Sequence, residues 1–209
     1  MYLPPLTGIE VTMNDVQLDV LREIGNIGAG NATTALAKLV NLKIDMKVPR
    51  VAMVGFPNLA ETIGNEEELM VAVLVTLSVD INGIMMFMMD KKSAKFLIEQ
   101  MLAGSGMEVS DDFGDMEMSV VSEIGNIISG SYLTALSTLL NMNIDMSVPY
   151  TAVDMAAAII SVPAIEFGKI GDEVLLIQTD FGDDFDVNGF FILIPELESY
   201  GKILSALGL

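Results

Sequence analysis

The spacing of hydrophobic residues along the chain predicts strands and helices in regular succession. Apolar side chains alternate with others over residues 71–77, which is typical of a half-buried strand. The pair Asn82-Gly83 predicts a two-residue hairpin that leads into a returning strand over residues 84–89. Asp90 then predicts the N-cap of a short helix that is apolar on one face. Because hairpins join antiparallel strands, we expect a mainly antiparallel sheet covered by helices.

Two long helices are predicted, over residues 14–40 and 115–140, and an extended segment follows each one, over residues 44–54 and 144–154. At 100° per residue, leucine, alanine and glycine residues of the first helix gather on one face. The opposite face carries a line of residues at i, i+4, i+7 and i+11: Asp19, Glu23, Asn26 and Gly30. We therefore expect these residues to face solvent.

The sequence contains an internal duplication. Residues 19–50 and 119–150 are identical at 17 of 32 positions. A second match pairs residues 80–83 with residues 186–189 at an offset of 106 instead of 100. The second copy thus has six additional residues, and we expect them in the acidic stretch near Asp183.

We therefore expect an α+β protein in which a duplicated unit forms one pseudo-two-fold domain over residues 1–209. The repeats are expected over about residues 14–103 and 113–209, with a glycine- and aspartate-rich linker over residues 104–112. The predicted architecture is a mainly antiparallel sheet with two long helices and several shorter ones.

The polar line of the first long helix recurs in the second copy as Ser119, Glu123, Asn126 and Gly130. Polar residues on an exposed helix face need no functional explanation by themselves. Other predicted surface positions, however, differ between the copies, for example Arg22 and Ser122. Asparagine and glycine are also unfavourable inside a helix. We therefore predict that the two Glu–Asn pairs are functional.

Composition restricts the function. With 29 acidic and 10 basic residues, the formal net charge of −19 opposes binding to nucleic acids and to anionic membranes. The chain has no histidine or cysteine, which excludes the commonest general base, the commonest thiol nucleophile and the usual zinc ligands, and no metal site is predicted. No apolar run is long enough to span a bilayer, and the first residues lack a basic segment typical of a signal peptide, so we expect a cytoplasmic protein.

A carboxylate and a carboxamide one turn apart cannot act as nucleophile and base, because an amide is not a base. The carboxylate can hold a cation of a partner, and the carboxamide can orient a water molecule. Orientation is sufficient when the bond to be broken is labile and the transition state is loose, as in an acyl phosphate on a protein aspartate.

The spacing Asp/Ser-x3-Glu-x2-Asn-x22-Pro, which ends at Pro49 in the first copy and at Pro149 in the second, resembles the signature of the CheC/CheX/FliY family of chemotaxis phosphatases. The segment EIGNIGAGNA is similar to CheC-type members, and two intact motifs also resemble the CheC type rather than the CheX type. We expect both prolines to mark where the chain enters its first strand, and Asp19 and Ser119 to orient the surface.

This resemblance implies dephosphorylation of the response regulator CheY. Glu23 and Glu123 would contact a lysine of the regulator, and Asn26 and Asn126 would orient the attacking water. No cofactor belongs to the chain itself, and the magnesium ion would be held by the regulator. The receptor deamidase CheD is a second implied partner. Two alternatives remain: a non-enzymatic binding module, like the middle domain of the flagellar switch protein FliM, which lacks the pairs, and an adaptor that chiefly binds CheD.

Overall fold

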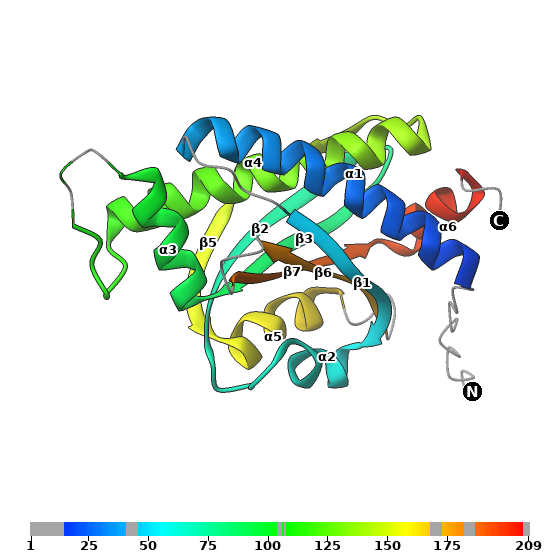
Figure 1. Ribbon diagram of the computed structural model, residues 1–209. Coiled ribbons are helices and arrows are strands. Elements are labelled where there is room, and N and C mark those ends of the chain that lie inside the picture. Colours follow the sequence, from blue (N-terminus) through cyan, green and yellow to red (C-terminus); the bar gives the residue numbers. More distant parts are fainter. Residues whose placement is uncertain are drawn as a thin grey trace.

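The computed structural model (Figure 1) describes residues 15–40, 46–103, 106, 108–167, 173–181 and 187–206. Its helices are α1 (Asp15–Val40), α2 (Phe56–Ile63), α3 (Lys91–Met101), α4 (Asp115–Leu140), α5 (Ala156–Phe167) and α6 (Leu197–Ala206). Its strands are β1 (Met46–Gly55), β2 (Leu69–Val79), β3 (Gly83–Asp90), β4 (Ile144–Met146), β5 (Tyr150–Met155), β6 (Glu173–Phe181) and β7 (Val187–Pro195). The predicted α+β class is confirmed, and α1 and α4 each have 26 residues.

One antiparallel sheet joins the two copies of the repeat. Among the described residues its strand order is β1-β6-β7-β3-β2-β4, and β5 also pairs with β2. The first strand of each copy pairs with the second strand of the other copy: β1 pairs with β6, whereas β4 and β5 pair with β2. The third strands, β3 and β7, meet at the centre. Exchanging the copies reproduces this order, which is the predicted pseudo-two-fold symmetry.

Helices cover both faces of the sheet (Figure 1). The long helices α1 and α4 lie side by side on one face and run in opposite directions. Ile98 of α3 and Ile203 of α6 also belong to the core under α1 and α4. Helices α2 and α5 cover the other face around a second core that includes Leu59 and Ile160. No helix in the described parts of the chain is long and apolar enough to cross a bilayer.

The central strand β3 is buried on both faces. Met85 and Met89 belong to the core under α1 and α4, whereas Met86 and Met88 belong to the core under α2 and α5. The methionine-rich run thus fills the interior, since a flexible thioether side chain adapts to irregular space. The predicted N-cap is also present, because the Asp90 side chain accepts a hydrogen bond from the backbone of α3.

The hairpin between β2 and β3 has a longer connection than predicted, because Leu77 with Gly83 is the last pair of the ladder. Gly83 therefore begins β3 and does not lie in a two-residue turn. Its φ is 153°, and a Cβ there would lie 2.3 Å from the carbonyl oxygen of Ile194 in β7. The glycine thus permits close approach of two strands. In the second copy, Asn188 and Gly189 likewise lie within β7.

The additional residues of the second copy are also distributed differently from the prediction. Arg50 in the first copy pairs with Gln178, and the equivalent residue of the second copy, Tyr150, pairs with Leu74. Leu74 and Gln178 are therefore equivalent, and they are 104 residues apart. Four residues are therefore inserted before β6. Helix α5 has 12 residues and α2 has 8, so the insertion lengthens α5 by about one turn. The remaining two residues lie between β6 and Gly189, in a stretch where Asp183 is outside the described residues.

Helices α2 and α5 were not among the predicted elements. Helix α5 begins Ala-Ala-Ala-Ile-Ile, is apolar at most positions and contains Pro163, so it has no clear helical periodicity. Helix α2 has an apolar face that includes Leu59 and Ile63, but both helices directly follow a strand with no loop between them, so neither is set apart from the preceding extended segment in the sequence.

Pro49 lies inside β1 and not at its entry, so the expectation is wrong for the first copy, whereas Pro149 directly precedes Tyr150, where β5 begins. The pairing of β1 with β6 shifts around Pro49, between Lys47 and Arg50. Pro149 lies in the interval between β4 and β5. Because proline has no backbone N–H to donate, it fits an edge strand where the ladder is interrupted.

Two glycines permit the long helices to approach their neighbours closely. A Cβ at Gly125 of α4 would lie 2.4 Å from Cγ1 of Val73 in β2. A Cβ at Gly28 of α1 would lie 2.9 Å from Cγ of Tyr132 in α4. The Tyr132 ring in turn packs on Phe191 of β7, with ring centroids 4.1 Å apart. The positions of α1 and α4 on the sheet therefore depend on these glycines.

We predict that Gly125→Ala lowers the free energy of unfolding by about 1–3 kcal/mol, because the new methyl group would overlap Val73 in a closely packed core. The matched control is Gly25→Ala in α1, where the nearest atom to a Cβ is the end of the Val48 side chain at 3.2 Å. Urea denaturation measures both variants. A loss for Gly125→Ala that does not exceed the loss for Gly25→Ala would contradict the assigned packing.

Candidate active site

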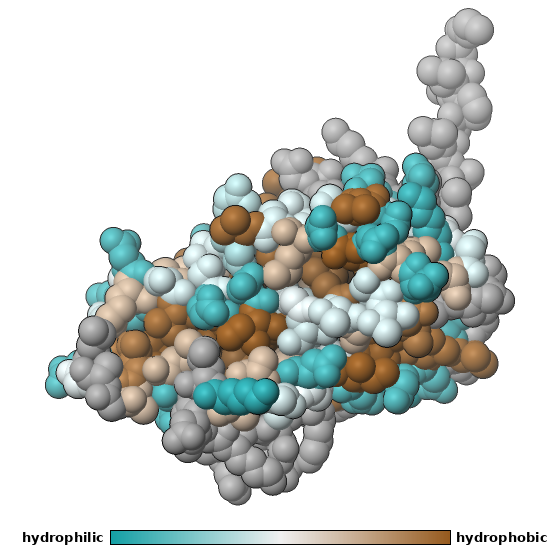
Figure 2. All heavy atoms as spheres, turned by 90° about the horizontal axis from the view of Figure 1, so that it is seen from above, coloured by the Kyte–Doolittle hydropathy of each residue, from teal (hydrophilic) through white to brown (hydrophobic). Residues whose placement is uncertain are grey.

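Both Glu–Asn pairs lie on the outer faces of the long helices, as the helical periodicity predicts. Glu23 and Asn26 are exposed near the middle of α1. In α4, Glu123 is exposed and Asn126 is half-buried. The view onto these helices shows hydrophilic and hydrophobic residues intermixed on the surface (Figure 2). Glu23, Asn26 and Glu123 are therefore open to a partner protein, and Asn126 is partly so.

The two Glu–Asn pairs lie on separate surfaces. Helices α1 and α4 meet through the side of α1 that carries Gly28, where Tyr132 of α4 lies. Ala32, one turn further on the same side, is completely buried. Glu23 and Asn26 project from the other side of α1. Each pair thus belongs to its own helix surface, with no residue in common.

The residues before each pair differ between the sites. Asp19 is exposed, and its Oδ1 accepts a hydrogen bond from Arg22 Nη1 at 2.5 Å within an ion pair. Ser119 is also exposed, and Ser122 takes the place of the arginine. Both flanking residues lie on the surface, as predicted, but the first site has an ion pair beside it where the second has hydroxyl groups.

Besides Gly30 and Gly130, two further pairs of surface residues are identical in the copies and were not among the predicted site residues. Ile27 is 45% exposed, and Ile127 is half-buried at the equivalent position of α4. Thr34 and Thr134 are both exposed. The offset-100 identity was visible in the sequence, but buried residues such as Ile24 share that identity. Solvent exposure is needed to separate the two groups.

A groove opens beside the second site. Its volume is about 520 Å³, and it runs along the outer face of α4 from Gly130 to Thr138, with β4 as its other wall. Its lining includes polar side chains such as Ser137 and Asp145 together with apolar Met146. The surface next to Asn126 is therefore hollowed along the helix, in the direction of the α4 C-terminus.

The N-terminus of α4 is held by the buried side chain of Glu117. Its carboxylate accepts hydrogen bonds from the backbone N–H of Ser110 at 2.9 Å and of Gly114 at 3.0 Å. These bonds lower the pKa of Glu117, and the bond from Ser110 has the largest effect. The carboxylate also lies in the first turn of the helix, where a negative charge is favourable. Glu117 thus ties the segment before α4 to the helix that carries the second site.

Each Glu–Asn pair supplies a carboxylate and a neutral amide. Glutamate accepts hydrogen bonds and attracts a cation, whereas asparagine both donates and accepts. Both groups lie on rigid helices, so their positions are set before a partner binds. Each site can therefore hold a positively charged group and orient a small polar molecule, but it has no nucleophile–base couple of its own.

The fold and the site together define a class of proteins. FliY of Thermotoga maritima superposes with a TM-score of 0.75 at 22% identity, covering 95% of this chain and 98% of that chain. The FliM middle domain from H. pylori superposes with a TM-score of 0.67 at 11% identity, covering 93% and 99%. At these identities the likeness concerns the fold alone, which is the duplicated fold of FliY and the FliM middle domain.

The sequence comparisons identify the family within this class. The model of the CheC-like family matches residues 16–53 and 116–151, which contain both Glu–Asn pairs. The CheY-P phosphatase CheC of Bacillus subtilis is 32% identical over 200 residues, covering 94% of this chain and 96% of its own length. The chain belongs to the CheC-like family.

We predict that Glu117→Gln lowers the free energy of unfolding at neutral pH, because a neutral amide accepts these backbone hydrogen bonds more weakly. The lowered pKa means that Glu117 stabilises the fold fully above the pKa of an unfolded glutamate. This contribution is lost as the pH falls through the folded-state pKa, so the difference between wild type and variant should shrink there. Urea denaturation at several pH values measures the difference.

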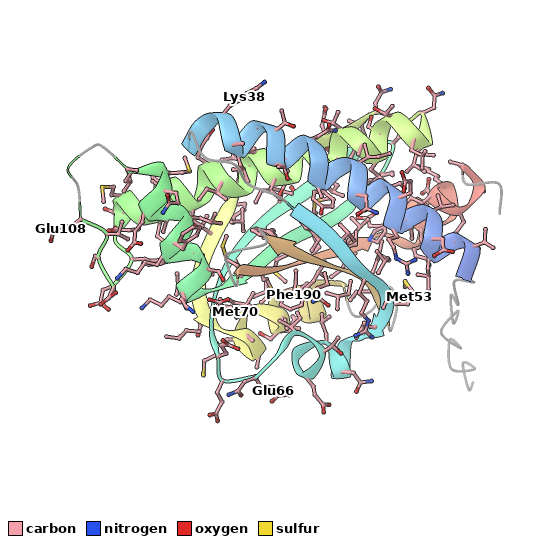
Figure 3. The ribbon with its side chains drawn as sticks, viewed as in Figure 1. Lys38, Met53, Glu66, Met70, Glu108 and Phe190 are labelled. Carbon is pink, nitrogen blue, oxygen red and sulfur yellow. The ribbon has the colours of Figure 1, made fainter. Side chains whose placement is uncertain are left out.

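The control for this prediction is Glu108→Gln, at an exposed position before the same helix (Figure 3). A difference for Glu117→Gln that stays constant down to low pH would show that the charge of Glu117 is not responsible.

Proposed function

We propose that the protein is a phosphatase that hydrolyses the aspartyl phosphate of the chemotaxis response regulator CheY, at two sites per chain. The supporting observation is the pair of exposed Glu–Asn sites at equivalent positions of α1 and α4. They occur in a chain that is 32% identical to the CheY-P phosphatase CheC of Bacillus subtilis over nearly the whole length of both. The regulator is expected in the cytoplasm.

In this proposal Glu23 and Glu123 hold the regulator by contacting a lysine beside its phosphorylated aspartate. A carboxylate on an exposed helix face forms such an ion pair without burial of an unpaired charge. The contact fixes where the phosphoryl group lies relative to the helix. Each glutamate is therefore a binding residue, and its removal should weaken the complex.

Asn26 and Asn126 orient the water that attacks phosphorus. The carboxamide oxygen accepts one hydrogen bond from this water, so that an oxygen lone pair faces the phosphoryl group in line with the aspartyl oxygen. A P–O bond to the water forms as the P–O bond to aspartate breaks, the aspartate leaves as a carboxylate, and one proton of the water passes to a phosphoryl oxygen, which gives dihydrogen phosphate. A magnesium ion held by the regulator would neutralise phosphoryl charge. Because the transition state is loose, positioning supplies most of the acceleration.

The non-enzymatic alternative rests on the fold, since the FliM middle domain shares it. A binding module of that kind requires no asparagine on an exposed, mid-helix position. Asparagine is less favourable there than most polar residues, yet both copies carry it. The repeated Glu–Asn pair therefore favours the phosphatase.

We predict that Asn26→Ala and Asn126→Ala each remove the turnover of one site and leave binding of the regulator nearly unchanged. The double variant should be inactive, because alanine cannot orient water. The losses should be roughly additive, since the sites share no residues. Release of inorganic phosphate at saturating phosphorylated CheY measures turnover, and full activity of the double variant would refute the mechanism.

The control for the division of roles is Glu23→Lys combined with Glu123→Lys. A lysine in place of the carboxylate repels the lysine of the regulator, so KM should rise while the asparagines remain. An unchanged KM in this variant would remove the proposed role of the glutamates.

A second candidate function, as an adaptor for the deamidase CheD, is favoured by the surface of α5. On this helix Val162 is 53% exposed and Ile165 is 72% exposed, and the neighbouring Met155 of β5 is 45% exposed. The equivalent position to Val162 on α2 is Thr62, a polar residue. Apolar side chains gathered on one exposed element are typical of a protein-binding surface. We propose that CheD binds here, on the face of the sheet opposite the Glu–Asn sites.

We predict that Val162→Asp combined with Ile165→Asp abolishes binding of CheD, because a charge at the centre of an apolar interface stays desolvated and unpaired. Phosphatase activity measured without CheD should be unchanged, since α5 lies on the other face. The matched control is Thr62→Asp on α2. Isothermal titration with CheD measures binding, and unaltered affinity in the α5 variant would exclude this surface.

A further inference from the structure

Identity between the copies has a simple explanation at buried positions. Ile24 and Ile124 are both buried in the core under the long helices, as are Leu36 and Leu136. Equivalent helices that cover one sheet bury equivalent side chains, so the fold itself requires these residues. Exposed positions carry no such requirement, and identity there calls for another reason.

The positions that are exposed in α1 and identical in both copies form a continuous strip, and their counterparts in α4 are exposed or half-buried. At 100° per residue they lie within about 100° of one another on the helix surface. The strip consists of Glu23, Asn26, Ile27, Gly30 and Thr34 on α1 and of Glu123, Asn126, Ile127, Gly130 and Thr134 on α4. We call it the outer strip. It extends the Glu–Asn pair by about two helical turns toward the C-terminus of each helix.

Positions on both sides of the outer strip differ between the copies. On one side, Arg22 of α1 corresponds to Ser122 of α4. On the other side, Lys38 corresponds to Thr138, and Lys38 projects into solvent from the last turn of α1 (Figure 3). Charge and size therefore vary next to the strip, whereas the strip itself is identical. A surface contacted by the same partner at both helices has this pattern.

Gly30 and Gly130 have no packing reason inside the molecule. A Cβ at Gly30 would meet no atom within 4 Å, and a Cβ at Gly130 would approach only the end of the Met146 side chain, at 3.6 Å. Glycine is about 1 kcal/mol less favourable than alanine inside a helix. Gly28 and Gly125, in contrast, are needed for packing. The missing side chain in the strip leaves room for something outside the chain.

The other strip residues supply contacts beside this space. Ile27 places an apolar side chain on the surface, 45% exposed, next to Asn26. The Thr34 hydroxyl donates to the carbonyl oxygen of Gly30 at 2.9 Å, and the Thr134 hydroxyl donates to that of Gly130 at 2.7 Å. With its proton used in this way, each hydroxyl oxygen can only accept a bond from a partner. At the second site, the groove along α4 begins at Gly130.

We propose that the outer strip is the docking surface of the phosphorylated receiver domain, with Gly30 and Gly130 as the points where the main chain of the receiver comes closest to the helix. This inference rests on the proposed function and extends it beyond the Glu–Asn pair. Ile27 is an apolar anchor of the interface at the first site, whereas Ile127, which is half-buried against the core, offers a smaller apolar surface at the second. The close approach at the glycines sets how deeply the neighbouring asparagine reaches toward the phosphoryl group.

The test uses two variants altered in both copies, Ile27→Ala/Ile127→Ala and Gly30→Leu/Gly130→Leu. Binding is measured by isothermal titration with CheY activated by beryllofluoride, which is not hydrolysed, and turnover is measured by phosphate release. We expect each variant to raise Kd by about tenfold or more, as loss of an interface anchor or a steric block does. Gly30→Ala/Gly130→Ala should raise Tm while it weakens binding, because alanine favours the helix.

Two controls separate docking from stability. Gly201→Leu alters an exposed glycine of α6 that also has no atom within 4 Å of a Cβ. Lys38→Thr gives the first copy the residue of the second copy, next to the strip but outside it. Both controls should bind the activated regulator as the wild type does.

The outcomes distinguish this inference from the proposed function. Wild-type protein that binds and dephosphorylates CheY, with strip variants that bind equally well, would overturn the docking strip alone. If the wild type binds activated CheY but releases no phosphate, and the strip variants bind weakly, the docking strip is supported and the phosphatase function is refuted. Wild-type protein that does not bind activated CheY would overturn both.

Discussion

Exchange of strands between the two copies is the constraint on which the rest of the structure depends. Each copy supplies a β-hairpin, β2–β3 or β6–β7, but its first strand pairs with the hairpin of the other copy. A two-stranded hairpin alone is marginally stable in water. The strand β3 is buried on both faces, and the edge that does not pair with β2 pairs with β7 of the other copy. The copies therefore form one cooperative core, and α1 and α4 pack on one continuous sheet.

This shared sheet determines where a site can lie. One side of each long helix is occupied by the sheet and the neighbouring helix, and close contacts at Gly28 and Gly125 hold the helices in place. Only the outer side of each helix is left for contacts with a partner, and Glu23 and Glu123 are exposed there. A rigid helix surface suits a reaction in which the protein mainly positions water and a labile bond. The duplication gives two such surfaces that do not interfere with each other.

Divergence between the copies has occurred away from the outer strip. The additional turn and the exposed apolar residues of α5 distinguish the second copy on the opposite face of the sheet, and the Asp19–Arg22 ion pair distinguishes the first copy beside its site. A duplicated fold can change at such positions without loss of its core, because they lie on the surface. A shared partner for the two helices and a different partner for α5 would produce this combination of identity and difference.

The sequence alone determined the duplication, the two long helices, the strand β2 and the solvent-facing position of the Glu–Asn pairs, because identity at a constant offset and local periodicity can be read without knowing distant neighbours. It did not determine that β1 pairs with β6, that Gly83 lies inside a strand beside Ile194, or that Pro49 lies at a shift in strand pairing. Those features depend on contacts between residues far apart in the chain. Ile27 and Ile24 are likewise indistinguishable by identity between the copies, since both are isoleucines repeated at the same offset. Only the packing of α1 on the sheet decided that one is buried and the other faces solvent.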